Sequence, residues 1–186
     1  MASDSFLVFT KPAVVPFGTI APEGESQDKA FGPLKAIQLA SFMLGTENPT
    51  TIGSASSGAG AGKVKFQTFE VTKNVDKASA SLFTACASKA HFPQVDLYIR
   101  KAGAASAPGG GTGHSYLLYT FRLVFITTVS WSGGAGQDAP TETVDFVYGA
   151  LGISYYSQDA TGALAAQPES AQWSQVKNTP TLDVSG

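Results

Sequence analysis

Apolar and polar side chains alternate along this chain in short runs that are bounded by Gly, Pro, Ser and Asn. The clearest run is VDLYIR at residues 95–100, in which every second side chain is apolar. A period of two is typical of a half-buried β-strand, and many such runs separated by turn residues indicate an antiparallel barrel or sandwich. The pattern therefore predicts a mainly β protein.

The alternation slips by one residue in three places, within residues 37–44, 64–71 and 146–153. A slip of one residue sends a side chain to the other face of a sheet, so each slip predicts a β-bulge or a bend. Bent strands are how small sheets curl, and this favours a barrel. Residues 116–131, the longest apolar stretch, are interrupted by polar residues and are interpreted as another strand.

One segment, at about residues 77–89, has the helical period instead, with Asp76 or Ser79 as its N-cap. Apolar residues at i, i+4 spacing, and others that widen their stripe, are Ala78, Leu82, Cys86, Phe83 and Ala87. We expect this helix to plug or flank the barrel.

Three segments rich in Gly, Pro, Ser or charged residues are predicted loops, at residues 18–32, 45–62 and 103–113. We expect one domain over residues 1–164. A polar tail at 165–186 follows, which either adds one strand or remains loose.

The composition excludes several classes of function. The net charge is −2 and the basic residues are scattered, so neither nucleic acid nor an anionic membrane is an expected partner. The single cysteine, Cys86, allows no internal disulfide and is expected to be buried and inert. Residues 1–10 lack the basic and long apolar regions of a signal peptide, and the apolar stretch at 116–131 is too short for a membrane-spanning helix.

No pattern of catalytic or ligand-binding residues emerges. GAGAGKV at residues 58–64 lacks the first glycine and the Ser or Thr of a phosphate-binding loop. The two histidines, His91 and His114, have no nearby metal-ligand partners in the sequence. Glu142 and Asp145 lie three apart on a predicted strand and so point to opposite faces. We expect no cofactor, no metal and no enzymatic activity.

Three blocks of sequence carry a family resemblance. They are GESQDK at 24–29, the run at 62–103 that contains TKNVDKAS, LFTACAS and IRKAG, and PTETVDFVYGALGISYYSQD at 140–159. In this order and spacing they resemble the Hcp family, the haemolysin-coregulated tube proteins of type VI secretion. The chain departs from the family at Ala80, where a proline is usual, and in a longer hairpin at 104–114.

The resemblance implies a compact antiparallel β-barrel of two sheets flanked by one α-helix, assembling as a hexameric ring. Rings would stack into a tube that leaves the cytoplasm when a sheath contracts and reaches the extracellular space or a target cell. The implied partners are further copies of the chain, the sheath, spike and baseplate proteins, and small effectors. An adhesin-like binding module is the alternative, and a phage-like tail-tube protein would have the same architecture.

The resemblance also suggests which residues make contacts in the tube. In the strand at 37–45, Phe42 and Leu44 match positions that pack into the barrel, so Ser41 and Met43 would face the lumen and its effectors. The alternative for Met43 is that it covers a local apolar patch. Contacts between subunits or between rings are assigned to residues of the long loop, namely Thr50, Ile52, Ser54, Ser57 and Gly60.

Overall fold

The computed structural model describes residues 3–49, 63–101, 115–136, 138–159 and 164–185. The protein is mainly β, as predicted, and the described residues contain one helix, α1 (Ser79–Ser88). Its strands are β1 (Ser3–Phe9), β2 (Ala13–Val15), β3 (Gly18–Ile20), β4 (Ile37–Leu39), β5 (Ser41–Met43), β6 (Thr46–Glu47), β7 (Lys65–Phe66), β8 (Phe69–Asn74), β9 (His91–Lys101), β10 (Ser115–Ser132), β11 (Thr141–Tyr155) and β12 (Glu169–Ser174).

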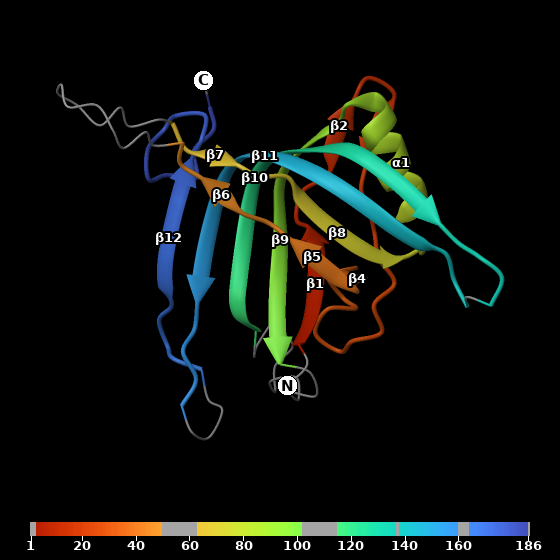
Figure 1. Ribbon diagram of the computed structural model, residues 1–186, viewed down its shortest axis with the longest axis horizontal. Helices are drawn as coiled ribbons and strands as arrows, with labels where there is room; N and C mark the ends of the chain where they lie inside the picture. Colours follow the sequence, from red (N-terminus) through yellow and green to blue (C-terminus); the bar gives the residue numbers. More distant parts are fainter. Residues whose placement is uncertain (1–2, 50–62, 102–114, 137, 160–163, 186) are drawn as a thin grey trace.

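One antiparallel sheet of eight strands forms the barrel (Figure 1). Its order is β4-β1-β9-β10-β11-β8-β5. β8 pairs with residues 141–146 of β11, and β12 pairs with residues 150–155 of the same strand. β4 and β5 lie at opposite ends of this order although only Ala40 separates them in the chain. The chain therefore passes from one edge of the sheet to the other at a single residue, which nearly closes the barrel.

The predicted slips correspond to real bends. At residues 37–44 the bend is the change from β4 to β5, and at 64–71 it is the break between β7 and β8. At 146–153 the strand is unbroken, but buried and exposed positions stop alternating, because residues 148–152 are all buried. On the neighbouring strand β10, Leu123 has a φ of 52°, and the pairing with β11 shifts by one residue between Ile126 and Thr128.

Stacked aromatic rings fill the centre of the barrel. Phe69 lies between Phe121 and Phe146, with ring centroids 4.5 and 5.3 Å apart, and Tyr148 meets the edge of Phe121 at 4.9 Å. All three phenylalanines are fully buried. Each aromatic pair adds about 0.5–1.5 kcal/mol beyond the burial of its area. Phe69, Phe146 and Tyr148 lie in the alternating segments that the sequence shows at 64–71 and 146–153.

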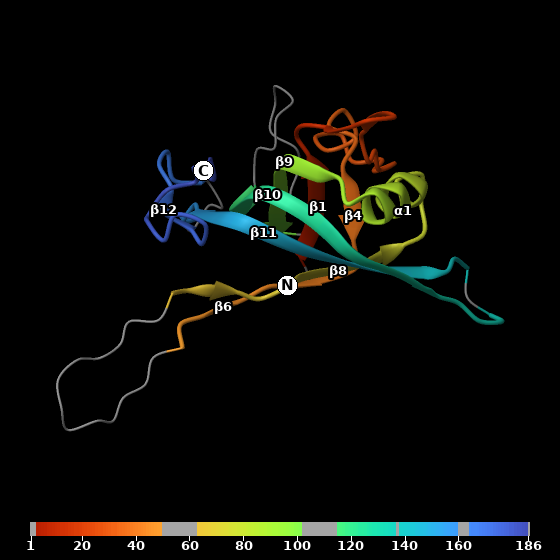
Figure 2. The ribbon, with the colours of Figure 1, turned by 90° about the horizontal axis from the view of Figure 1, so that it is seen from above.

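Helix α1 lies against the sheet and packs on β10, whereas β6 and β7 extend away on the other side (Figure 2). Its buried residues are Ser79, Leu82 and Ala85. Phe83 is 54% exposed and Ala87 is exposed, so the predicted widening of the apolar stripe by these two residues is wrong.

The expected cap of this helix is also different. The N-cap residue is Ala78, and no side chain forms a capping hydrogen bond at that position. Neither Asp76 nor Ser79 is therefore the N-cap. Asp76 nevertheless accepts a hydrogen bond from the N–H of Ala78, at 2.9 Å, and satisfies a donor of the turn that precedes the helix. Cys86 is partly buried, more exposed than expected, and packs against the core.

Two of the predicted loops contain short strands. Residues 18–20 form β3, which pairs with β2, and residues 46–47 form β6, which pairs with β7. Alternation over two or three residues is too short to distinguish from loop sequence. The predicted loop at 103–113 lies outside the described residues.

Candidate assembly face and the ion pair behind it

The outer face of the sheet is a polar surface built from four neighbouring strands. Phe42 turns toward the core from β5, so its neighbours Ser41 and Met43 lie on the opposite face, where both are exposed. Met43 is 62% exposed. The pairing of β5 with β8, β8 with β11, and β11 with β10 extends this face across the sheet.

Two rows of side chains cross this face from strand to strand. Pairing partners in an antiparallel sheet share a face, so the rows follow from the registers. The members of the first row, in order, are Met43, Glu70, Asp145 and Thr128. The members of the second row are Ser41, Thr72, Thr143 and Ser130. We call this surface the outer face; hydroxyl groups dominate it.

The outer face contains two carboxylates directly opposite each other. Glu70 on β8 pairs with Asp145 on β11, and the Oδ1 atom of Asp145 is buried without a hydrogen-bond partner. Like charges at paired positions destabilise a sheet. The first row is therefore acidic at its centre.

We expect Glu70→Gln to raise the free energy of unfolding by about 0.2–1 kcal/mol, because it removes this repulsion and offers an amide donor to Asp145. Urea denaturation measures the change. Glu47→Gln is the matched control: Glu47 is also on a strand but lies opposite Lys65, so neutralising it should not stabilise the protein. Equal effects of the two substitutions would contradict the proposed repulsion.

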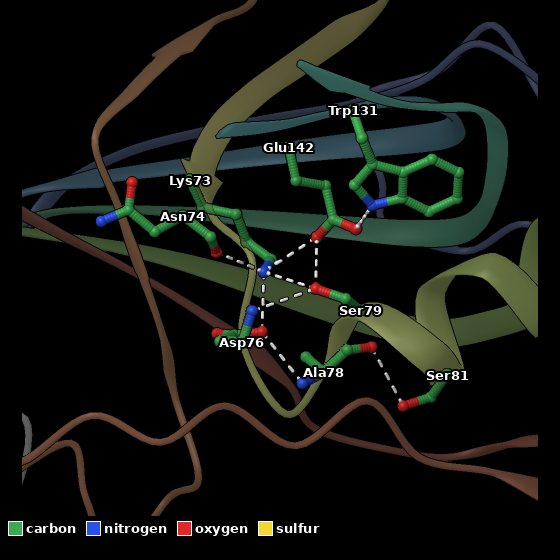
Figure 3. Close-up of polar contacts among 8 residues, drawn as sticks. All are labelled: Lys73, Asn74, Asp76, Ala78, Ser79, Ser81, Trp131 and Glu142. Atoms are coloured by element: carbon green, nitrogen blue, oxygen red, sulfur yellow. Dashed lines mark hydrogen bonds and ion pairs between the residues drawn. The ribbon is translucent and has the colours of Figure 1, made fainter. Parts of the chain in front are cut away.

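Behind this face lies a buried ion pair, formed by Lys73 of β8 and Glu142 of β11 (Figure 3). The lysine Nζ is 2.8 Å from the Oε2 of Glu142, and the two side chains are 1% and 0% exposed. The ammonium also contacts Asp76 at 2.6 Å, the Oγ of Ser79 at 3.2 Å and the carbonyl of Asn74 at 2.8 Å. The buried charge is thus fully hydrogen-bonded, as a buried charge must be.

The second carboxylate oxygen of Glu142 accepts a hydrogen bond from the indole Nε1 of Trp131 at 2.6 Å. Ser79 donates its hydroxyl to the Oε2 atom at 3.0 Å and accepts from the backbone N–H of Asp76 at 3.1 Å. Figure 3 shows these groups converging from β8, β11, the end of β10 and the start of α1. The cluster therefore fastens the helix and the long β10–β11 hairpin to β8.

A second charged cluster holds the loop after β3. The Nη2 of Arg100, on β9, is 2.5 Å from Asp28 and 3.3 Å from Asp4. Its guanidinium lies over the rings of Phe6 and Phe31, which stack at 4.1 Å. The hydrogen bond from Arg100 holds the pKa of Asp28 below its usual value. This anchor places the GESQDK block against the barrel.

The other residues that the sequence singled out are dispersed. Within the described part of the chain, His91 is exposed on β9, and Glu142 and Asp145 do point to opposite faces. His114 lies outside the described residues, as do all five residues assigned to contacts between subunits or rings: Thr50, Ile52, Ser54, Ser57 and Gly60. Nothing in the described structure brings these residues together as a catalytic centre.

The Lys73–Glu142 pair is not predicted from the sequence, although the alternation contains a signal for it. Lys73 continues the inward phase of Phe69 and Val71, and Glu142 precedes the inward Val144. A lysine and a glutamate at core positions of two strands require each other as partners. The pairing of the two strands is needed to see that they meet.

The described residues offer neither a metal centre nor a membrane-spanning helix. Over the ranges that the structure describes, no three His, Cys, Asp or Glu side chains gather closely enough to hold a metal ion. Among the same residues, no helix combines the length and the apolar character needed to cross a bilayer.

Comparison with known proteins gives a consistent family. The family model described as type VI secretion system effector, Hcp, matches residues 14–155. Protein hcp1 of Pseudomonas aeruginosa is 35% identical over 116 residues, which cover 62% of this chain and 68% of that protein.

Solved structures share the whole fold. The structure of a type six secretion system protein aligns with a TM-score of 0.76 at 27% identity, covering 97% of this chain and 100% of that one. Hcp1 from Salmonella typhimurium aligns with a TM-score of 0.70 at 26% identity, again over 97% and 100% of the two chains. With its nearly closed barrel, its single described helix and a family match across most of its length, this chain belongs to the Hcp family of type VI secretion system effectors.

Proposed function

We propose that this protein is the tube subunit of a type VI secretion system, in which six copies close into a ring and rings stack into a hollow tube. The observation that carries the proposal is the family match over residues 14–155, which covers α1 and the strands from β3 to β11. A head-to-tail ring needs two different surfaces on each subunit. Neither of these surfaces is the outer face, for which a position toward the lumen is proposed below.

The partners proposed with this role are the sheath, spike and baseplate proteins and small effectors. The subunit would assemble in the cytoplasm and leave the cell when the sheath contracts. A structural and transported role needs no catalytic group, which agrees with the dispersed positions of the reactive side chains described above. The family match does not favour the adhesin-like alternative.

In the assembled ring, we place the outer face toward the lumen, with Met43 and Ser41 as effector contacts. Two features support this orientation: Met43 is 62% exposed although it is large and apolar, and its partner across the sheet is the charged Glu70. A flexible thioether on a polar surface gives weak, adaptable contacts, which suit a carrier that must release its cargo. The five loop residues Thr50, Ile52, Ser54, Ser57 and Gly60 remain proposed contacts between subunits or between rings.

Light scattering and negative-stain imaging of the purified protein test the assembly. We expect a particle of six subunits and annular projections. A strictly monomeric species at high concentration, with no rings on the grid, would reject the tube proposal.

Met43→Glu tests the lumen contact. Because the side chain is exposed, the substitution should leave ring size and unfolding temperature nearly unchanged while severalfold less effector co-purifies. Val14→Glu provides a control, since Val14 is 77% exposed on β2, away from the outer face. If Met43→Glu unfolds the subunit, or if both substitutions reduce effector equally, Met43 has no specific role in binding cargo.

A further inference from the structure

A cavity of about 650 Å³ lies between the C-terminal tail and the outside of β9 and β10. The barrel contributes His91, Arg122 and Leu123 to its walls, and the tail contributes residues 181–185. The cavity is open to solvent and is separate from both the outer face and the Lys73–Glu142 pair. It has the size of a site for a small molecule or for a few side chains.

The tail that forms one wall is held firmly in place. Leu182 covers Gly152, where an added Cβ would lie 3.3 Å from its Cδ1 atom. Val184 covers Gly149 in the same way, at 3.2 Å. Ser174, fully buried at the end of β12, donates its N–H to the carbonyl of Thr179 at 2.9 Å. The cavity is therefore formed by the fold itself.

Arg122 is the unusual group in this cavity. The chain has two arginines, and Arg100 is balanced by Asp4 and Asp28. Arg122, in contrast, has no ion pair and no hydrogen bond in the described part of the chain. Its Nε atom is buried without an acceptor, as are the Nε and Nη1 atoms of Arg100. A guanidinium is always charged and presents a rigid fork of donors. An unpaired guanidinium beside a cavity can therefore receive an anionic ligand there.

The cavity wall also contains one carboxylate, Asp183, but its partners lie within the tail. Asp183 forms an ion pair with Lys177, and its Oδ1 atom accepts hydrogen bonds from the N–H and the hydroxyl of Ser185, at 2.9 and 2.7 Å. The tail thus neutralises its own acidic residue. The remaining uncompensated charge on the cavity wall is the positive charge of Arg122.

We propose that this cavity is a binding site for a carboxylate, which Arg122 receives through paired hydrogen bonds from its guanidinium. The apolar side chains of Leu123, Leu182 and Val184 suit a short aliphatic group attached to that carboxylate. Such a ligand is either a free organic acid or the Glu or Asp side chain of an adjoining copy of the chain. Both present the same chemistry to Arg122.

Calorimetric titration of the folded protein with glutarate, and separately with glutaramide, tests the site. We expect saturable binding of glutarate, weakened by at least about tenfold in Arg122→Gln and less in Arg122→Lys, because a charged bidentate contact is lost. Lys29→Gln, which removes an exposed charge outside the cavity, should bind glutarate like the wild type. Glutaramide, which is neutral, should not bind.

The assembly state of the same variants identifies the source of the carboxylate. If Arg122→Gln reduces assembly measured by sedimentation, while glutarate binds only the dissociated protein, the ligand is a side chain of an adjoining copy. If glutarate binds and assembly is unchanged, the ligand is a free acid. Equal glutarate binding by wild type and both Arg122 variants, equal binding of glutaramide, or no binding together with unchanged assembly would overturn the proposal.

Discussion

Replacing Lys73 with methionine should lower the free energy of unfolding by about 3–5 kcal/mol, the cost of leaving one partner of a buried ion pair alone. Glu142 is fully buried, and without the ammonium it would keep hydrogen bonds only from Trp131 and Ser79. The helix start would lose its attachment to β8 at the same time. Urea denaturation under conditions that keep the subunit dissociated measures this change.

Two further variants separate the buried charge from simple loss of a lysine. Lys77→Met removes an exposed lysine paired with Glu23 and should change the free energy of unfolding by at most about 1 kcal/mol, as for other surface pairs. The double variant Lys73→Met with Glu142→Leu should cost less than the sum of its single changes, because no charge is left buried. A cost below about 1 kcal/mol for Lys73→Met alone would show that water reaches the carboxylate.

The second large effect is expected at Gly24, in the GESQDK block. A Cβ at this position would lie 2.2 Å from the carbonyl oxygen of Ala36 and 2.7 Å from the Cα of Ile37. Both are backbone atoms, so no side-chain rotation relieves the clash. Gly24→Ala should therefore lower the free energy of unfolding by about 3 kcal/mol, at the upper end for overpacking.

The loop around Gly24 should also loosen, because its N–H bonds the carbonyl of Lys35 at 2.8 Å. Hydrogen exchange should report faster exchange at Ala30 and Phe31, whose N–H groups bond Asp28. Gly134→Ala is the control, since no atom lies within 4 Å of an added Cβ there. A Gly24→Ala protein as stable as this control would mean that the loop is not docked as described.

The two clusters of charged residues have a common role in the architecture. Lys73 fastens α1 to the sheet, and Arg100 fastens the loop after β3 to β9 and β1. Buried ion pairs add little net stability compared with apolar residues, but their geometry disfavours other arrangements. In a subunit that repeats many times in a tube, we expect this precision to matter more than stability.

Under the orientation proposed above, the outer face would contact cargo and so affect which cargo binds. Its central pair, Glu70 and Asp145, gives each subunit two neighbouring negative charges beside the exposed Met43. With six copies around a lumen, these charges would recur in a ring at one level. Under the proposed orientation, the same row combines an apolar contact with an acidic one.

Local sequence determined much of the fold. Alternation found the long strands, including the interrupted stretch that became β10, because side chains of a strand point to the two faces in turn. The slips predicted the bends at Ala40 and near Gly149, since a change of phase must be visible in the sequence whatever the partner strand. The blocks from GESQDK to PTETV identified the family, because their order and spacing along the chain are those of its members.

What sequence could not supply depends on residues that are distant in the chain. Lys73 and Glu142 are neighbours only because β8 pairs with β11, and Arg122 faces a cavity only because residues 181–185 of the tail form its other wall. The helical period places Phe83 on the apolar stripe, but it does not give the angle at which the helix meets the sheet, and so it does not predict that Phe83 is exposed. Local patterns encode which way a side chain points, whereas pairing and packing of the whole chain decide what it meets there.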